Sequence, residues 1–235
     1  MGAPSARRRR ILLVLVVGVG LGLRLAHWIW VRQEPFVALP VMDSLVYLER
    51  AREIVAGDWL GQGSSFLSPF YPYLVALLLP LSGGSLDAVF LVQIGAAGVG
   101  LWALFRTGEI LEGPAVGFAG AGLAALCGPL VFHDVLLLKE SLAASLTAVL
   151  LYALTREELD RRWWPWLGTG VVWGLVGLLR ENAVLLLPIL ALLIWIRRKS
   201  WRGLGAALGG LLLGFSLVIA PFVLRSLALT GSPLP

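Results

Sequence analysis

The chain has 235 residues, 58% of them hydrophobic and only 14% charged, whereas a soluble domain carries roughly 25% charged residues. Since a soluble core cannot bury so much apolar surface, the composition excludes an ordinary soluble domain and predicts an all-α, polytopic integral membrane protein. The formal net charge of +5 comes from basic residues in short runs beside apolar segments, which favours a lipid bilayer as the partner and argues against nucleic acid.

The first apolar run covers residues 11–31 and follows the arginines Arg7 to Arg10. As a helix it is about 31 Å long, enough to cross a hydrocarbon core of roughly 30 Å. No clean small-x-small cleavage site interrupts it, so we expect a retained signal-anchor helix. The arginines predict a cytoplasmic N-terminus, because basic residues are enriched on that side of a membrane.

Residues 32–85 are predicted to form the first external loop, with two interfacial helices. Apolar residues recur at helical spacing between Asp43, which is placed to cap a helix, and Gly57, which is placed to end it. Residues 66–81 are apolar but contain three prolines. If they crossed the membrane, the later basic loops would lie outside, so we expect a second interfacial helix there.

The next apolar segments are predicted to cross the membrane in alternating directions. Residues 86–105 run inward, 114–132 outward, and 136–154 inward again. A last span, 203–224, carries the chain outward.

Residues 166–196 are apolar except for the triplet Arg180-Glu181-Asn182 in their middle. A single span would leave the flanking basic loops on opposite sides of the membrane. Two half-length helices, 166–179 and 183–196, keep both loops inside. This gives about seven transmembrane helices, with the polar triplet buried in protein or lining a wet cavity.

On this layout the charges that interrupt apolar runs gather at the external end of the helices. Such charges are costly near hydrocarbon and usually mark a functional site. Asp43 can be a capping residue, a general base, or both. Arg24 and Arg225 can either snorkel or add positive charge to the same cavity.

His133-Asp134 and Lys139-Glu140 flank the turn between the third and fourth spans. Polar residues belong at any turn, and a lysine there can snorkel. In the functional interpretation, Lys139 contacts a phosphate, and Asp134 or Glu140 positions an acceptor or binds a metal. One histidine with two carboxylates is a weak metal signal, so we predict no metal site and leave a divalent cation open.

The triplet Arg180-Glu181-Asn182 also has two interpretations. An Arg–Glu pair can order the helix break, or Arg180 can form a fork toward a phosphate.

Two sequence patterns accompany these charges: Asp43-x-x-x-Tyr47-x-x-x-Ala51-x-x-Ile54-x-x-Gly57 with Pro69-x-Tyr71-Pro72, and Gly177-Leu178-Leu179-Arg180-Glu181-Asn182 with Lys139-Glu140. The first resembles the first external loop of the protein-mannosyltransferase-like, family 39 glycosyltransferases of the GT-C superfamily. The second is similar to bacterial members of that group.

The resemblance implies hexosyl or pentosyl transfer from a polyprenyl-phosphate sugar to a glycan, lipid or protein acceptor at the external or periplasmic face of the plasma (inner) membrane. It implies that Asp43 is the catalytic base and that Arg180 and Lys139 hold the donor phosphate. The residues expected to bind substrate are His133, Asp134, Lys139, Glu140, Arg180, Glu181, Asn182 and Arg225.

The chain departs from the family in two ways. Asp43 is followed by Ser44, where many relatives have a glutamate. Family members are also commonly longer, so we expect residues 1–235 to be a single transmembrane module, incomplete at its C-terminus. The alternatives are a non-catalytic or truncated membrane subunit and, less favoured, a transporter.

Overall fold

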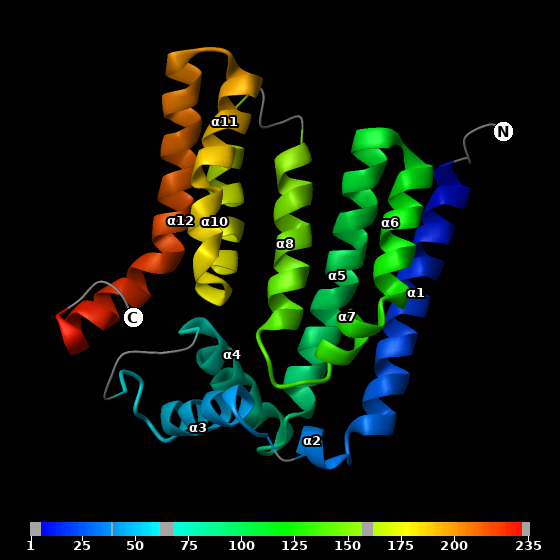
Figure 1. Ribbon diagram of the computed structural model, residues 1–235, viewed down its shortest axis with the longest axis vertical. Helices are drawn as coiled ribbons and strands as arrows, with labels where there is room; N and C mark the ends of the chain where they lie inside the picture. Colours follow the sequence, from blue (N-terminus) through cyan, green and yellow to red (C-terminus); the bar gives the residue numbers. More distant parts are fainter. Residues whose placement is uncertain (1–5, 39, 62–67, 157–161, 232–235) are drawn as a thin grey trace. The chain divides into compact units, whose positions relative to one another are not determined.

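The computed structural model describes residues 6–38, 40–61, 68–156 and 162–231. All the regular secondary structure in these ranges is helical (Figure 1). The predicted all-α class is therefore confirmed.

Residue contacts divide the chain into two compact units. Unit 1 comprises Met1–Trp59 and Tyr71–Thr155, and unit 2 comprises Leu60–Phe70 and Arg156–Pro235. A single module over 1–235 stays a prediction.

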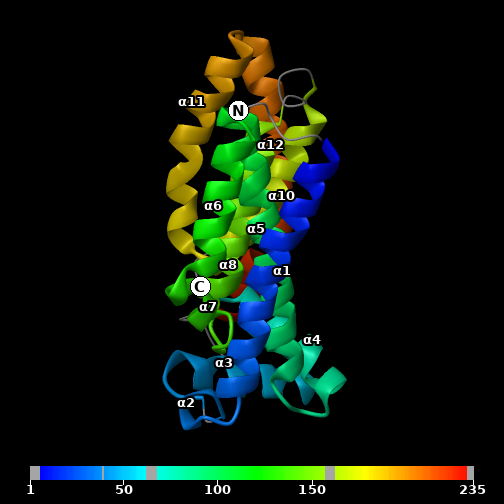
Figure 2. The ribbon, with the colours of Figure 1, turned by 90° about the vertical axis from the view of Figure 1, so that its right-hand side faces the viewer.

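Three helices of unit 1 pack against one another. These are α1 (Ala6–Val31), α5 (Asp87–Glu112) and α6 (Pro114–Leu126), which lie side by side (Figures 1 and 2). Gly113 separates α5 from α6 with φ 95°, a left-handed value that favours glycine. Pro114 then opens α6, where its missing N–H costs no helical hydrogen bond.

The sequence predicted one continuous helix over residues 114–132, and this prediction is wrong. The helix breaks at Cys127, whose backbone is extended (φ −69°, ψ 105°), and resumes as the short helix α7 (Gly128–His133). Pro129 explains the break, because it has no N–H to donate to the Ala125 carbonyl oxygen and its ring crowds that carbonyl group. The next helix, α8 (Glu140–Thr155), begins at Glu140 and not at residue 136.

Shorter helices form the region after α1. They are α2 (Pro35–Ala38), α3 (Asp43–Val55), α4 (Phe70–Leu78) and the 3-10 helix η1 (Leu79–Ser82). Helix α3 buries Tyr47, Leu48, Ala51 and Ile54 on one side, which makes the helix amphipathic.

Unit 2 is built on α10 (Trp164–Leu179) and α12 (Trp201–Thr230), which pack closely together. Glycines allow the approach: a Cβ atom on Gly170 would collide with the carbonyl oxygen of Leu211, and one on Gly214 with that of Leu167. In the sequence, the 3-10 helix η2 (Glu181–Leu186) and α11 (Leu187–Arg198) connect α10 to α12.

Among the described residues, α1, α5 and α12 are long and apolar enough to cross a membrane. Four apolar helices are shorter: Phe70–Ser82, Pro114–Leu126, Glu140–Thr155 and Trp164–Leu179. The chain therefore has the helices of a membrane protein, while the count of seven spans and the interfacial position of two helices stay predictions.

Candidate functional site

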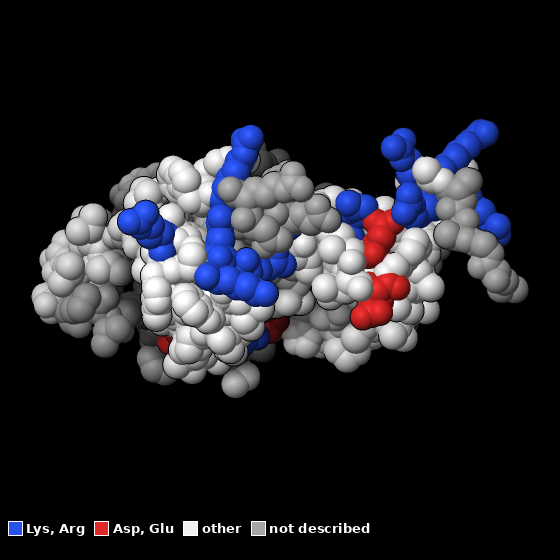
Figure 3. Space-filling view, turned by 90° about the horizontal axis from the view of Figure 1, so that it is seen from above, with Lys and Arg blue, Asp and Glu red and all other residues white. Residues whose placement is uncertain are grey.

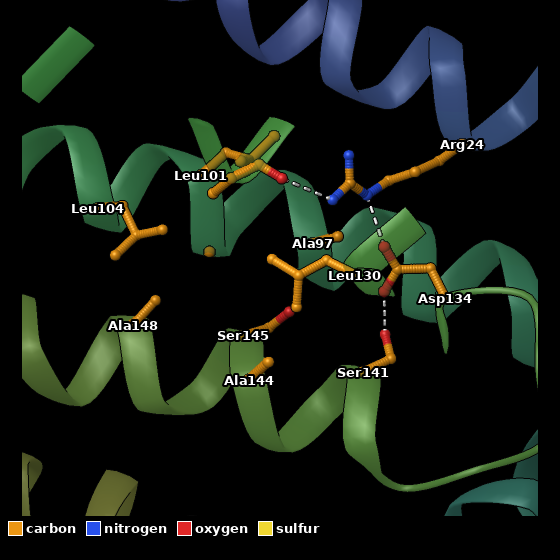
Figure 4. Close-up of a pocket in the computed structure, with 12 residues that line it drawn as sticks. Arg24, Ala97, Leu101, Leu104, Leu130, Asp134, Ser141, Ala144, Ser145 and Ala148 are labelled. Carbon is orange, nitrogen blue, oxygen red and sulfur yellow. Dashed lines mark hydrogen bonds and ion pairs between the residues drawn. The ribbon is translucent and has the colours of Figure 1, made fainter. Parts of the chain in front are cut away.

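A buried ion pair joins α1 to the turn that follows α7. Nε of Arg24 donates to Oδ2 of Asp134 at 2.5 Å, and the two residues are only 1% and 3% exposed (Figure 4). The remaining guanidinium N–H groups donate to carbonyl oxygens, including Gly20 at 2.9 Å and Ala125 at 3.1 Å. Arg24 therefore does not snorkel, and because Asp134 neutralises it, it adds no unpaired charge to a cavity.

The second oxygen of Asp134 is also occupied. Oδ1 accepts a hydrogen bond from the Ser141 hydroxyl (Figure 4). Burial raises the pKa of Asp134, and the bond from Ser141 and the charge of Arg24 oppose that rise. With both oxygens engaged, Asp134 fixes the turn before α8, and its direct contact with substrate stays a prediction.

A further buried side chain, Gln93 of α5, holds the same turn. Its Nε2 donates to the carbonyl oxygens of Asp134 at 3.1 Å and Leu136 at 2.9 Å, and its Oε1 accepts from the Tyr71 hydroxyl at 2.6 Å. Sequence reasoning missed Gln93, although an amide in the apolar run 86–105 is a usable signal.

The cavity beside this network is small. Arg24, Asp134, Ser141 and Ser145 line it together with apolar side chains, and its volume is ≈ 40 Å³. One water molecule needs a cavity volume of roughly 10–15 Å³. The cavity is therefore of water size, and the network around it supports the turn.

The predicted residues around this turn lie in different surroundings. Lys139 and Glu140 are half-buried at the start of α8, where the Lys139 carbonyl oxygen accepts from the Ala143 N–H at 2.9 Å. Burial raises the pKa of Tyr71, and Tyr47 and the Glu140 carboxylate add to the effect. Nδ1 of His133 lies 2.8 Å from the Pro129 carbonyl oxygen.

Asp43 lies in the first turn of α3 and is exposed. It is not the N-cap, which corrects the capping prediction. That position belongs to Met42, whose φ of 52° is unusual for a residue with a side chain and whose side chain makes no capping hydrogen bond. The carboxylate is still favoured there by the helix dipole.

Two acidic residues that follow Asp43 in the chain are paired. Glu53 and Asp58 both face Arg50, with N–O distances of 2.6 and 3.5 Å. No ion pair found in the described part of the chain involves Asp43. Asp43 is therefore exposed and takes no part in the ion pairs that engage Glu53 and Asp58, which suits a general base.

In unit 2, the helix breaks where the sequence predicted. Arg180 is extended (φ −138°, ψ 99°) at the end of α10, and η2 begins at Glu181. Nε1 of Trp173 donates to the Ala183 carbonyl oxygen at 2.8 Å, which satisfies one backbone group of the break. Arg180, Glu181 and Asn182 are all exposed.

A pocket of ≈ 470 Å³ adjoins this break. Its walls are mainly apolar, and its charged lining residues are Glu181 and Arg225. Arg225 follows Pro221, which stands inside α12 and favours a kink there. Nε of Arg225 donates to the Leu60 carbonyl oxygen at 2.6 Å, which fixes the guanidinium. Of the predicted residues in unit 2, the structure thus brings Glu181 and Arg225 to one pocket, which Arg180 and Asn182 do not line.

The residues that the structure describes contain no group of three or more His, Cys, Asp or Glu side chains arranged to hold a metal ion. The option of a divalent cation stays a prediction.

Comparisons with known proteins bear on both units. No curated protein matches the chain. The family model described as dolichyl-phosphate-mannose-protein mannosyltransferase matches residues 67–224. The match begins after Asp43 and includes the Asp134–Ser141 turn and the break at Arg180. The chain belongs to the dolichyl-phosphate-mannose-protein mannosyltransferase family.

Proposed function

We propose that the chain is a GT-C type membrane glycosyltransferase, which moves a hexosyl or pentosyl group from a polyprenyl phosphate to an acceptor at the external face. The family match supports glycosyl transfer in a membrane setting. The observation that carries the choice of donor is the pocket of unit 2, an apolar groove with a fixed arginine.

The pocket suits a lipid phosphate. Its volume of ≈ 470 Å³ lies within the usual 300–1,000 Å³ of small-molecule sites. Phe215, Ile219 and Phe222 of α12 offer an apolar wall for isoprene units. Arg225 lies beside that wall and can hold the phosphate by charge-assisted hydrogen bonds.

The transfer is a direct displacement at the anomeric carbon. The acceptor hydroxyl oxygen forms the new bond to this carbon, its proton passes to the Asp43 carboxylate, and the bond to the phosphate oxygen breaks. Polyprenyl phosphate leaves with the bonding electrons, and its charge is stabilised by arginine. The anomeric configuration inverts. Lys139 and Arg180 are further candidates for holding the phosphate.

A matched pair of arginine variants tests the donor pocket. Wild-type protein in nanodiscs is given a radiolabelled polyprenyl-phosphate sugar, and the release of polyprenyl phosphate is measured. Arg225→Gln should lower this release about tenfold or more, because a charged hydrogen bond contributes roughly 1.5–3 kcal/mol.

The control, Arg202→Gln, removes an exposed arginine near the other end of α12 and should not change the rate. Equal rates for wild type and Arg225→Gln would contradict the pocket assignment. No release by the wild-type protein would contradict the proposed donor.

The helix break at Arg180 favours a second candidate, a transporter, because broken helices form substrate sites in many transporters. Cysteine labelling at position 182 distinguishes the two functions, with Cys127 replaced by alanine to remove the background. Labelling by an impermeant reagent from the outside alone supports the transferase. Labelling from both sides supports transport.

A further inference from the structure

A second charged pocket of unit 1 lies near the first residues of α1, well away from the buried Arg24 pair. Its volume is ≈ 410 Å³, and α1, α5 and α8 line it. Arg9 and Arg24 are 15 residues apart on one helix, so the two sites are separated by about 22 Å along the helix axis.

Basic residues dominate this pocket. Arg9, Arg10 and Arg106 line it with one carboxylate, Glu109, so its lining carries a formal charge of +2 (three arginines minus one glutamate). The right-hand side of Figure 3 shows basic side chains gathered beside acidic ones at this end of α1. A surplus of positive charge in a recess attracts an anion.

The carboxylate organises two of the arginines. Oε1 of Glu109 lies 2.8 Å from Nη1 of Arg9, and Oε2 pairs with Arg106. The Glu109 side chain is only 9% exposed, whereas those of Arg9 and Arg106 are 38% and 39% exposed. The buried Glu109 carboxylate therefore holds both guanidinium groups, while part of each arginine side chain stays accessible to a ligand. Arg10 is exposed.

An aromatic wall completes the pocket. Trp102 and Tyr152 both line it, and their rings meet edge to face with centroids 4.9 Å apart. Such rings favour the boundary between hydrocarbon and water, where one side of a ligand is apolar and the other charged. The pocket thus offers arginines for an anion and aromatic rings for the organic group attached to it.

We propose that this pocket binds a phosphate group, carried by a membrane lipid or free in solution. Guanidinium groups suit phosphate because their N–H donors match its oxygens in pairs. The arginine-rich end of α1 is also the end that the positive-inside tendency assigns to the cytoplasm, where anionic lipids are enriched and basic pockets between helices bind their headgroups.

Measuring lipid binding to the purified protein tests this proposal independently of sugar transfer. Native mass spectrometry measures retention of phosphatidylglycerol, with zwitterionic phosphatidylcholine as the comparison lipid, and inorganic phosphate is added as a competitor. The wild-type protein should retain phosphatidylglycerol in preference to phosphatidylcholine. Competition by millimolar phosphate would identify the phosphate alone as the ligand, and a lack of competition would identify the whole lipid headgroup.

Two arginine variants locate the site. Arg10→Gln should weaken the retention of phosphatidylglycerol about tenfold, since it removes one guanidinium group from the pocket. Arg7→Gln removes the same charge from the same turn of α1 but from a residue that does not line the pocket, so it should leave retention unchanged. Equal losses in both variants, or no preference for phosphatidylglycerol in the wild type, would overturn the proposal.

Discussion

At the scale of single residues, the carboxylates of this protein differ in how completely they are paired. Asp134 uses both oxygens within the bundle, and Glu109 bridges two arginines. Asp43 is exposed and has no ion pair among the described residues. A general base must be accessible and able to take a proton, so Asp43 is suited to chemistry and Asp134 to positioning.

The Arg24–Asp134 pair should be needed for stability. Asp134→Leu leaves the Arg24 guanidinium charged and unpaired inside the bundle, which costs about 3–5 kcal/mol. The double variant Arg24→Leu, Asp134→Leu removes both charges and should recover most of that loss. Thermal unfolding in one detergent measures both. A single variant as stable as the wild type would contradict the role of the pair.

At the scale of helices, glycines set the distance between α10 and α12. Gly214→Val places a side chain against the Leu167 carbonyl oxygen and should destabilise the protein by about 1–3 kcal/mol or more. Gly209→Val is the matched control, because a Cβ atom at Gly209 of the same helix meets nothing within 4 Å. Melting temperatures compare the two, and equal temperatures would argue against close packing at Gly214.

Helix positions followed well from local signals in the sequence. The apolar spacing after Asp43 predicted α3, and the triplet at Arg180 predicted the break before η2. The break at Cys127 was missed, although Pro129 signals it. Such signals lie within a few residues of the feature that they predict.

Contacts between distant residues could not be predicted in this way. Arg24 and Asp134 are 110 residues apart in the sequence, and Gln93 and Asp134, whose carbonyl oxygen it contacts, are 41 residues apart. A single sequence shows that each side chain is costly in an apolar run, but the choice of partner depends on how the helices pack. The sequence therefore singled out Arg24 and Asp134 separately, and it did not predict that they pair.

At the scale of the whole molecule, the proposed orientation assigns opposite sides of the membrane to the two ends of unit 1. Single cysteines at positions 58 and 112, in a protein with Cys127 replaced by alanine, test it in intact cells. An impermeant maleimide should label position 58 and leave position 112 unlabelled until the membrane is permeabilised. The reverse pattern would overturn the orientation.

The central claim is that Asp43 activates the acceptor hydroxyl in sugar transfer from a lipid phosphate. The most direct measurement compares Asp43→Asn with Asp58→Asn in nanodiscs, using a labelled polyprenyl-phosphate sugar and an acceptor that the wild-type protein glycosylates. Both variants lose one carboxylate from the region between α1 and α5. We predict a loss of roughly 10²–10⁴-fold in transfer for Asp43→Asn and almost none for Asp58→Asn. Undiminished transfer by folded Asp43→Asn protein would contradict the claim.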